Sequence, residues 1–225
     1  MRLLAVNVEG AEIAELTSFL PLLTQEKRER CLKFQQKIDR CRAIVGHLLL
    51  SYGLAANACL ELELGEFGKP YLRAFPMQKF NLAHAGAWVF LGLSCEDIGV
   101  DIIKVEKTNL ALAARFFASE EYQQLVDLPE KEQDRGFAAL WALKESYIKA
   151  LGIGLSCKLN SFVVSLGEPP RILVGADKNF KLALLEIAPT YLGAVCCGEI
   201  PLAYQVERVE LAELIAHGRT VLEGL

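Results

Sequence analysis

Two long helical segments of this chain repeat one another, and this repeat constrains the fold more than any other feature. Asp39-Arg40 opens the first segment, and Asp134-Arg135 opens the second 95 positions later. Further identities occur at the same spacing: Ala43, Ser51, Tyr52 and Ala55 match Ala138, Ser146, Tyr147 and Ala150. Such identities arise from duplication, or by chance between two apolar helices. Duplication predicts an α/β (α+β) fold of two similar halves related by a pseudo-twofold axis.

The predicted halves are residues 1–103 and 104–225, each a small sheet packed with a long helix. Met1–Glu9 alternates like a first strand, and Ile98–Ile103 has the apolar pattern of a buried strand. Asp101 lies among apolar neighbours in that strand. It needs a cation or a capping role, because an unpaired buried carboxylate is costly. Ligand sites often lie where two such units meet, so we expect a site in the cleft between the halves.

The second helical segment divides into a charged face and an apolar face. At roughly 100° per residue, an arc of about 140° on one face holds Trp141, Lys144, Glu145 and Lys149. The other side holds Leu140, Leu143, Tyr147 and Ala150. This division predicts a helix whose apolar face joins the core and whose polar face lines a cleft for an anion and a metal ion. The alternative is a surface helix whose Lys and Glu side chains only face solvent.

A basic segment precedes the first long helix. Between Glu26 and Arg42 there are seven basic and three acidic residues, although the whole chain has a net charge of -4. The basic residues are Lys27, Arg28, Arg30, Lys33, Lys37, Arg40 and Arg42. The segment forms either a solvated helix with Glu–Lys pairs or a set of phosphate contacts, for which the planar guanidinium group is well suited. The mildly acidic total gives no indication of nucleic-acid binding.

Cysteine and histidine usage excludes several classes of site. The chain has seven cysteines, none spaced as C-x-x-C, and three histidines, so we expect neither a zinc cage nor a disulfide framework. The first apolar run is too short for a signal peptide, and no stretch approaches the length of a membrane span. We therefore expect a soluble, reduced, cytoplasmic protein. His47 lies in a strongly apolar helix and is expected to be a core or boundary residue rather than a catalyst.

Four motifs occur together in one order. They are Gly68-Lys69-Pro70, Phe80–Trp88 with His84 at its centre, Gly99-Val100-Asp101-Ile102, and Trp141-x-x-Lys144-Glu145-Ser146-x-x-Lys149. With the basic segment and the Arg-Phe-Phe-x-x-x-Glu-Tyr run from Arg115 to Tyr122, they resemble the 4'-phosphopantetheinyl transferase family, in its larger, monomeric, surfactin-synthetase-activating type. Each motif is weak alone, but the resemblance covers nearly the whole chain. It implies a monomer with its active site between the two halves.

The resemblance implies transfer of the 4'-phosphopantetheine arm of coenzyme A to a serine of an apo acyl or peptidyl carrier protein, releasing adenosine 3',5'-bisphosphate. It implies Mg²⁺, or Mn²⁺, held by Asp101 and Glu145, because Mg²⁺ prefers oxygen ligands. The implied catalytic residues are Glu145, Lys149 and Asp101, with Glu145 or a metal-bound water taking the serine proton. The implied coenzyme A ligands are Lys27, Arg30, Arg42, Lys69, His84, Lys144 and Lys149, of which Arg42 and His84 would meet the 3'-phosphate. The carrier is expected to dock near Leu110–Phe117.

Two departures from the family pattern bear on these expectations. Ile103 stands where the family usually has a carboxylate, and Glu106 comes three residues too late to replace it. Ala83-His84-Ala85 replaces the usual Ser-His-Ser, which removes hydroxyl groups available to the 3'-phosphate. We expect a weaker metal site in an active transferase. The alternatives are a metal-dependent phosphodiesterase that cleaves coenzyme A with water and a non-catalytic coenzyme A-binding protein.

Overall fold

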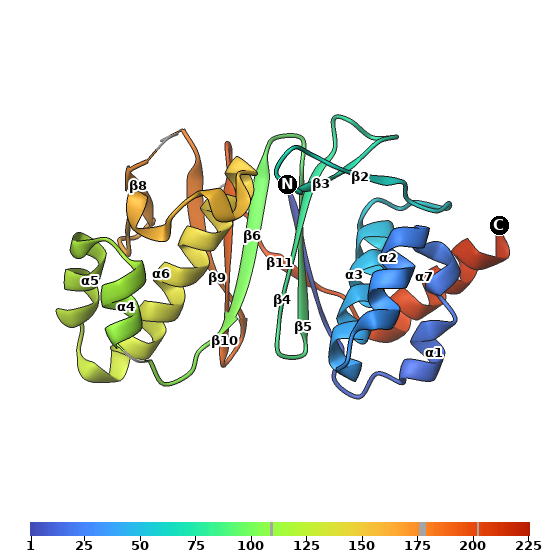
Figure 1. Cartoon of the computed structure of the whole chain (residues 1–225), viewed down its shortest axis with the longest axis horizontal. Coiled ribbons are helices and arrows are strands. Elements are labelled where there is room, and N and C mark those ends of the chain that lie inside the picture. Colours follow the sequence, from blue (N-terminus) through green and yellow to red (C-terminus); the bar gives the residue numbers. More distant parts are fainter. Residues whose placement is uncertain (109, 176–178, 202) are drawn as a thin grey trace.

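The protein is built in four layers, with two small sheets between two layers of helices (Figure 1). The computed structural model describes residues 1–108, 110–175, 179–201 and 203–225. The inner faces of both sheets share one apolar cluster, in which Leu3 and Phe90 of the first sheet pack with Val100 and Val195 of the second. Each outer face packs against its own helices in a separate cluster. The fold is therefore mixed α/β, as predicted.

The first sheet has the strand order β11-β1-β5-β4. Its strands are β1 (Arg2–Asn7), β4 (Lys79–Ala85), β5 (Trp88–Ser94) and β11 (Val206–Arg208). β1 pairs antiparallel with β5 and parallel with β11. The elements on and beside its outer face are α1 (Ile13–Thr17), η1 (Leu20–Leu22), α2 (Gln25–Lys33), α3 (Lys37–Gly53), α7 (Leu211–Glu223) and the ribbon of β2 (Leu62–Leu64) and β3 (Pro70–Leu72).

The second sheet has the order β6-β10-β9 and is antiparallel throughout. Its strands are β6 (Ile98–Lys104), β9 (Lys181–Ala188) and β10 (Tyr191–Cys197). Its outer face is covered by α4 (Leu110–Phe116), α5 (Ser119–Val126) and α6 (Glu130–Leu151), with η2 (Gly154–Ser156), η3 (Leu159–Ser161) and the hairpin of β7 (Val163–Ser165) and β8 (Arg171–Val174). At the seam, the Asn81 side chain of β4 accepts a hydrogen bond of 2.8 Å from the backbone N–H of Val100 in β6.

The packing divides the chain differently from the predicted halves 1–103 and 104–225. β6 ends at this boundary, yet its whole length pairs with β10 of the second sheet. β11 and α7 come from the predicted second half, yet β11 extends the first sheet and Leu214 of α7 lies in its core. The last segment therefore crosses back over the molecule, which sequence order alone does not indicate.

α6 is longer than the charged helix predicted from its motif. The repeat places the start of this segment at Asp134-Arg135, but the helix begins at Glu130, directly after Pro129. Proline is compatible with a helix start because the first backbone N–H groups of a helix have no partner within it. Gly152 ends the helix in the left-handed region with φ 71°, as its sequence position predicts. No helix among the described residues is long and apolar enough to cross a membrane.

Candidate active site

α6 lies in direct backbone contact with β6, and this contact brings the charged residues together. A Cβ atom at Gly99 would overlap the carbonyl oxygen of Ser146 and the backbone nitrogen of Ala150. Asp101 follows two residues later, so its side chain points to the same face of the sheet. Its Oδ1 atom accepts a hydrogen bond from Lys149 Nζ at 2.5 Å. The cation that the buried carboxylate of Asp101 requires is thus Lys149.

Glu145 is the second carboxylate of this cluster and is half-buried on α6. Burial raises its pKa, the negative charge of Asp101 raises it further, and Lys149 opposes both effects. Burial also raises the pKa of Asp101, against the effect of Lys149. Two close carboxylates with one lysine leave a net negative charge when ionised, which suits a divalent cation with oxygen ligands.

Ile103 shares the face of Asp101 but offers no ligand atom. It packs against the cluster of Ala138, Ala139 and Leu192. Within the described part of the chain, no group of three or more His, Cys, Asp or Glu side chains could hold a metal ion. A cation at Asp101 and Glu145 would therefore need further oxygens from water or from a bound ligand.

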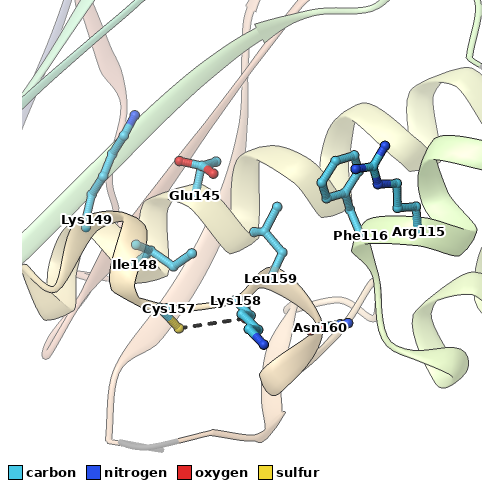
Figure 2. A pocket seen from close by; sticks show the side chains of 10 residues that line it. Arg115, Phe116, Glu145, Ile148, Lys149, Cys157, Lys158, Leu159 and Asn160 are labelled. Atoms are coloured by element: carbon cyan, nitrogen blue, oxygen red, sulfur yellow. Dashed lines mark hydrogen bonds between the residues drawn. The ribbon is translucent and has the colours of Figure 1, made fainter.

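A cavity of about 480 Å³ opens beside Glu145 and Lys149 (Figure 2). Ile148 also lines it from α6, and Arg115 and Phe116 at the end of α4 form another side. The segment that follows α6 forms the remaining wall with Gly154 and with residues 157–160. The cluster is therefore reached from a mouth that carries both apolar and basic side chains.

A second cavity of about 290 Å³ lies between α2, α3 and β4. Four of the predicted coenzyme ligands line it: Lys27, Arg30, Arg42 and His84. Arg42 donates from Nη1 to Asp39 Oδ1 at 2.9 Å and from Nε to the carbonyl oxygen of Gly86 at 2.7 Å, which orients its guanidinium group. Burial and the charge of Arg30 lower the pKa of Lys27 to about 8. We call it the anion cavity, because the cationic side chains that line it suit an anion.

His84 connects the anion cavity electrostatically to Lys149. Burial lowers the pKa of His84, and the positive charges of Arg42 and Lys149 lower it further. His84 therefore lies within electrostatic reach of residues from both sites.

Lys144 does not join these residues, which corrects the predicted division of the helix faces. Its side chain is fully buried, and Nζ donates to Glu121 Oε1 at 2.5 Å and to the Phe162 carbonyl oxygen at 2.7 Å. Nζ also lies 3.9 Å from the centroid of the Phe162 ring. Lys144 is adjacent to Glu145 in sequence but about 100° away around the helix, and α5 and the β7 segment cover that side. Lys144 thus holds these elements together and is not available to a phosphate.

Lys69 also lies apart from the anion cavity. Its Nζ donates to the carbonyl oxygens of Ile98 at 3.0 Å and Ala150 at 3.2 Å, so it connects the start of β6 to the end of α6. Burial is the main cause of its lowered pKa. It lines a separate cavity of about 240 Å³ beside the β2–β3 ribbon.

Glu121 is the structurally important residue that sequence reasoning did not single out. It is fully buried, and its carboxylate also accepts hydrogen bonds from the backbone N–H groups of Ala118 and Val164, at 2.9 and 2.7 Å. Glu121 belongs to the Arg115–Tyr122 run of the sequence motif. The sequence pattern, however, places its partner Lys144 on the helix face that was predicted to line the cleft. The run alone could not indicate the pairing.

The family model and the relatives that match this chain all indicate one protein family. Residues 97–196 match the sequence model of the 4'-phosphopantetheinyl transferase superfamily. The 4'-phosphopantetheinyl transferase ffp of Bacillus subtilis is 35% identical over 190 residues, which are 81% of this chain and 85% of that protein. The 4'-phosphopantetheinyl transferase Sfp of Bacillus subtilis strain 168 is 32% identical over 205 residues, which are 88% of this chain and 92% of that protein. Psf-1 of Bacillus pumilus is 31% identical over 201 residues, 86% of each chain. The chain therefore belongs to the 4'-phosphopantetheinyl transferase family.

Proposed function

We propose that this protein transfers the 4'-phosphopantetheine arm of coenzyme A to a serine hydroxyl of an apo carrier protein, in a magnesium-dependent reaction. The serine oxygen forms a bond to the phosphorus that carries the pantetheine, and the bridging P–O bond breaks. Adenosine 3',5'-bisphosphate leaves with the electron pair of that bond. The observation that carries this proposal is that His84 of the cation-lined cavity lies within electrostatic reach of Lys149 in the Asp101–Lys149–Glu145 cluster. The family membership names the chemistry.

The two cavities suit the 3'-phosphate and the pyrophosphate of coenzyme A. The 3'-phosphate would enter the cavity of Lys27, Arg30, Arg42 and His84, whose donors come from three different elements. The pyrophosphate would then lie toward Lys149, whose ammonium group is only partly buried. Moving Lys149 from Asp101 to a phosphate oxygen would keep its charge paired while releasing the carboxylate.

Asp101 and Glu145 are the proposed ligands of Mg²⁺ or Mn²⁺. The ion would neutralise the charge that develops on the pyrophosphate as the P–O bond breaks. Because Ile103 supplies no oxygen, the pyrophosphate and water would complete the coordination. We expect tighter metal binding in the presence of coenzyme A than in its absence.

The serine proton requires a base, and Glu145 is positioned for this role at the cavity wall. Glu145 would take the proton directly, or a metal-bound water would take it, because a carboxylate that holds a cation has a lowered pKa and is a weaker base. Glu145 would thus serve the nucleophile on one side of the reacting phosphorus while Lys149 stabilises charge on the other.

The carrier would dock at the end of α4. Leu112 is 45% exposed and Arg115 is also exposed, whereas Phe117 is buried in the core. Trp141 fixes this helix to α6 through ring contacts with Phe116 and Phe117. An exposed apolar side chain beside a cation is suited to an acidic helical partner.

The direct test incubates the protein with coenzyme A, Mg²⁺ and a panel of apo carriers, and measures the mass added to each carrier. A phosphopantetheine increase on at least one carrier is expected. Coenzyme A cleavage without carrier would indicate the phosphodiesterase instead, and binding without turnover would indicate a coenzyme-binding protein. No increase on any carrier would refute the proposal.

The metal ligands are tested by Glu145→Gln and Asp101→Asn. Each should lower kcat/KM by about 100-fold or more, roughly 2.7 kcal/mol, because each removes one of two carboxylate ligands. Electron paramagnetic resonance of Mn²⁺ bound to the protein–coenzyme A complex should show weaker binding in both variants. Unchanged Mn²⁺ affinity would exclude these ligand roles, even if activity were lost.

A further inference from the structure

Asn81 joins the two sheets, and the function described above gives it no part. β4 and β6 are edge strands of different sheets and lie against each other. Among the described residues, β4 pairs with β5 and β6 pairs with β10, so no ladder connects β4 to β6. Asn81 is buried, and its Oδ1 atom accepts a hydrogen bond of 2.8 Å from the backbone N–H of Val100. Because a backbone N–H can only donate, the oxygen of the amide must face Val100.

The edge of β6 that faces away from β10 is completed by side chains. An edge strand leaves every second backbone N–H and C=O group without a partner in its sheet. The N–H of Val100 and the carbonyl group of Ile98 lie on the same edge, since residues two apart point the same way. Asn81 accepts from the first, and Lys69 Nζ donates to the second at 3.0 Å. These two side chains therefore take the place of a neighbouring strand.

The sheets approach each other closely at this point. Asn81 is paired with Gly92 across the β4–β5 ladder. A Cβ atom at Gly92 would lie 2.6 Å from Val100 Cγ1 and 2.8 Å from Ile98 Cδ1. The first sheet thus has room for β6 because it carries a glycine here. The strand is held over the pair of Asn81 and Gly92 by close packing and by one hydrogen bond.

This hydrogen bond lies next to both parts of the proposed site. His84 of the anion cavity follows Asn81 by three residues on β4. Asp101 follows Val100 directly on β6. α6 is fixed to β6 because their backbones are in direct contact and because Lys149 pairs with Asp101 at 2.5 Å. The position of Lys149 relative to His84 therefore depends on how β6 is held against β4.

We propose that Asn81 is a positioning residue for phosphopantetheine transfer: by holding β6 through Val100, it sets the separation between the anion cavity and the Asp101–Lys149–Glu145 cluster. The proposal rests on the proposed function, in which one coenzyme A molecule spans these two places with its 3'-phosphate and its pyrophosphate. Asn81 is among the lining residues of neither cavity, so it acts through the backbone. It should matter little to a ligand that uses one place and much to a ligand that uses both.

Isothermal titration calorimetry compares two such ligands in the presence of Mg²⁺ and without carrier. Adenosine 3'-phosphate has only the group proposed for the anion cavity, whereas coenzyme A also has the pyrophosphate. Asn81→Leu keeps the size of the side chain and removes the acceptor. It should weaken coenzyme A binding by about five- to tenfold and change adenosine 3'-phosphate binding by less than about twofold, because only the first ligand depends on the geometry between two places.

Steady-state transfer to an apo carrier supplies the second measurement. Asn81→Leu should lower kcat by about 10- to 100-fold, because a misplacement of about 1 Å can cost that much. Asn81→Asp is the matched control: it has the same shape and retains an oxygen acceptor, so it should recover most of the lost kcat. Asn81→Ser is a further variant should Asn81→Leu fold poorly. Its shorter side chain leaves space for a water to satisfy the Val100 N–H, but a water does not hold β6, so the same losses are expected.

The outcomes separate the positioning role from the proposed function. A folded variant without the acceptor that kept both kcat and coenzyme A affinity would overturn the role of Asn81 and leave the proposed function standing. Equal weakening of the two ligands would overturn it as well, because it would show a general loss of structure. So would an Asn81→Asp protein that is no more active than Asn81→Leu. If the unmodified protein bound adenosine 3'-phosphate no better than adenosine, the placement of the 3'-phosphate would be wrong, and the positioning role would be lost with it.

Discussion

The two long helices of this protein carry its two sites, but they lie against their sheets in different ways. α6 touches β6 through backbone atoms at Gly99, where no Cβ fits. On α3, a Cβ added at Gly46 would meet only the side chains of Val89 and Leu82, at 3.7 and 3.8 Å. The first helix is separated from its sheet by a layer of side chains, and the second is not.

This difference in packing explains the difference in chemistry. Where α6 meets β6, charges from the helix and the strand are close enough to pair directly, as Lys149 and Asp101 do. Where α3 stands away from β4, the space between them is the anion cavity, bounded by Arg42 and His84. A closed ion cluster can hold a small cation, whereas the open cavity can admit a phosphate group. The different spacing between helix and sheet thus gives the two regions different chemical possibilities.

The largest expected effect comes from breaking the ion pair that fixes α6 to α5. Lys144→Met leaves the fully buried carboxylate of Glu121 without its cation, and loss of one partner of a buried pair costs about 3–5 kcal/mol. Chemical unfolding should show this loss of stability. The KM for coenzyme A should stay nearly unchanged, because Lys144 does not reach a cavity that holds phosphate.

The double variant Lys144→Met/Glu121→Gln is the control for that effect. It removes both charges, so it should be less destabilised than the sum of the two single variants. A Lys144→Met protein with normal stability and a raised KM for coenzyme A would instead support the phosphate role expected from the motif.

The spacing between each long helix and its sheet is tested by a matched pair of glycine substitutions. Gly99→Ala must push α6 from β6 because the added methyl group meets backbone atoms, and we expect a loss of about 1–3 kcal/mol in stability together with lower activity. Gly46→Ala adds the same group to α3 in ordinary contact distance and should be neutral or stabilising by up to about 1 kcal/mol. Thermal unfolding of both variants makes the comparison. Equal destabilisation by the two would contradict the proposed difference in packing.

Much of this architecture was accessible from the sequence, because it depends on local periodicity. The strand that carries Asp101 and both long helices were predicted near their observed positions. Asp101 was expected to need a partner because a lone charge in an apolar strand is costly. The family resemblance directed attention to Lys149, and the structure supplies the contact between them.

The remaining features depend on what covers each surface, which periodicity does not encode. The direction in which Lys144 points from α6 follows from its sequence position. Whether solvent or α5 lies in that direction does not. The same applies to α7: Leu214 indicates an apolar face, and that face could have packed on either sheet. Lys69 belongs to a recognisable motif, yet its contacts at Ile98 and Ala150 depend on two elements meeting in space.

The smallest expected effect lies at the mouth of the cavity beside α6, where the carrier would arrive. Arg115 and Lys158 line this mouth from opposite walls and are exposed. Exposed charges contribute only about 0.2–1 kcal/mol to an interaction, so Arg115→Gln and Lys158→Gln should each raise the KM for an acidic carrier by a few-fold at most. The KM for coenzyme A should not change, since neither residue lines the anion cavity. High salt should reduce the difference between these variants and the unmodified protein, because screening weakens exposed charges. Steady-state assays with carrier and coenzyme varied separately provide the measurement. A rise in the KM for coenzyme A alone would move the carrier surface away from α4 and show that the open mouth also serves the nucleotide.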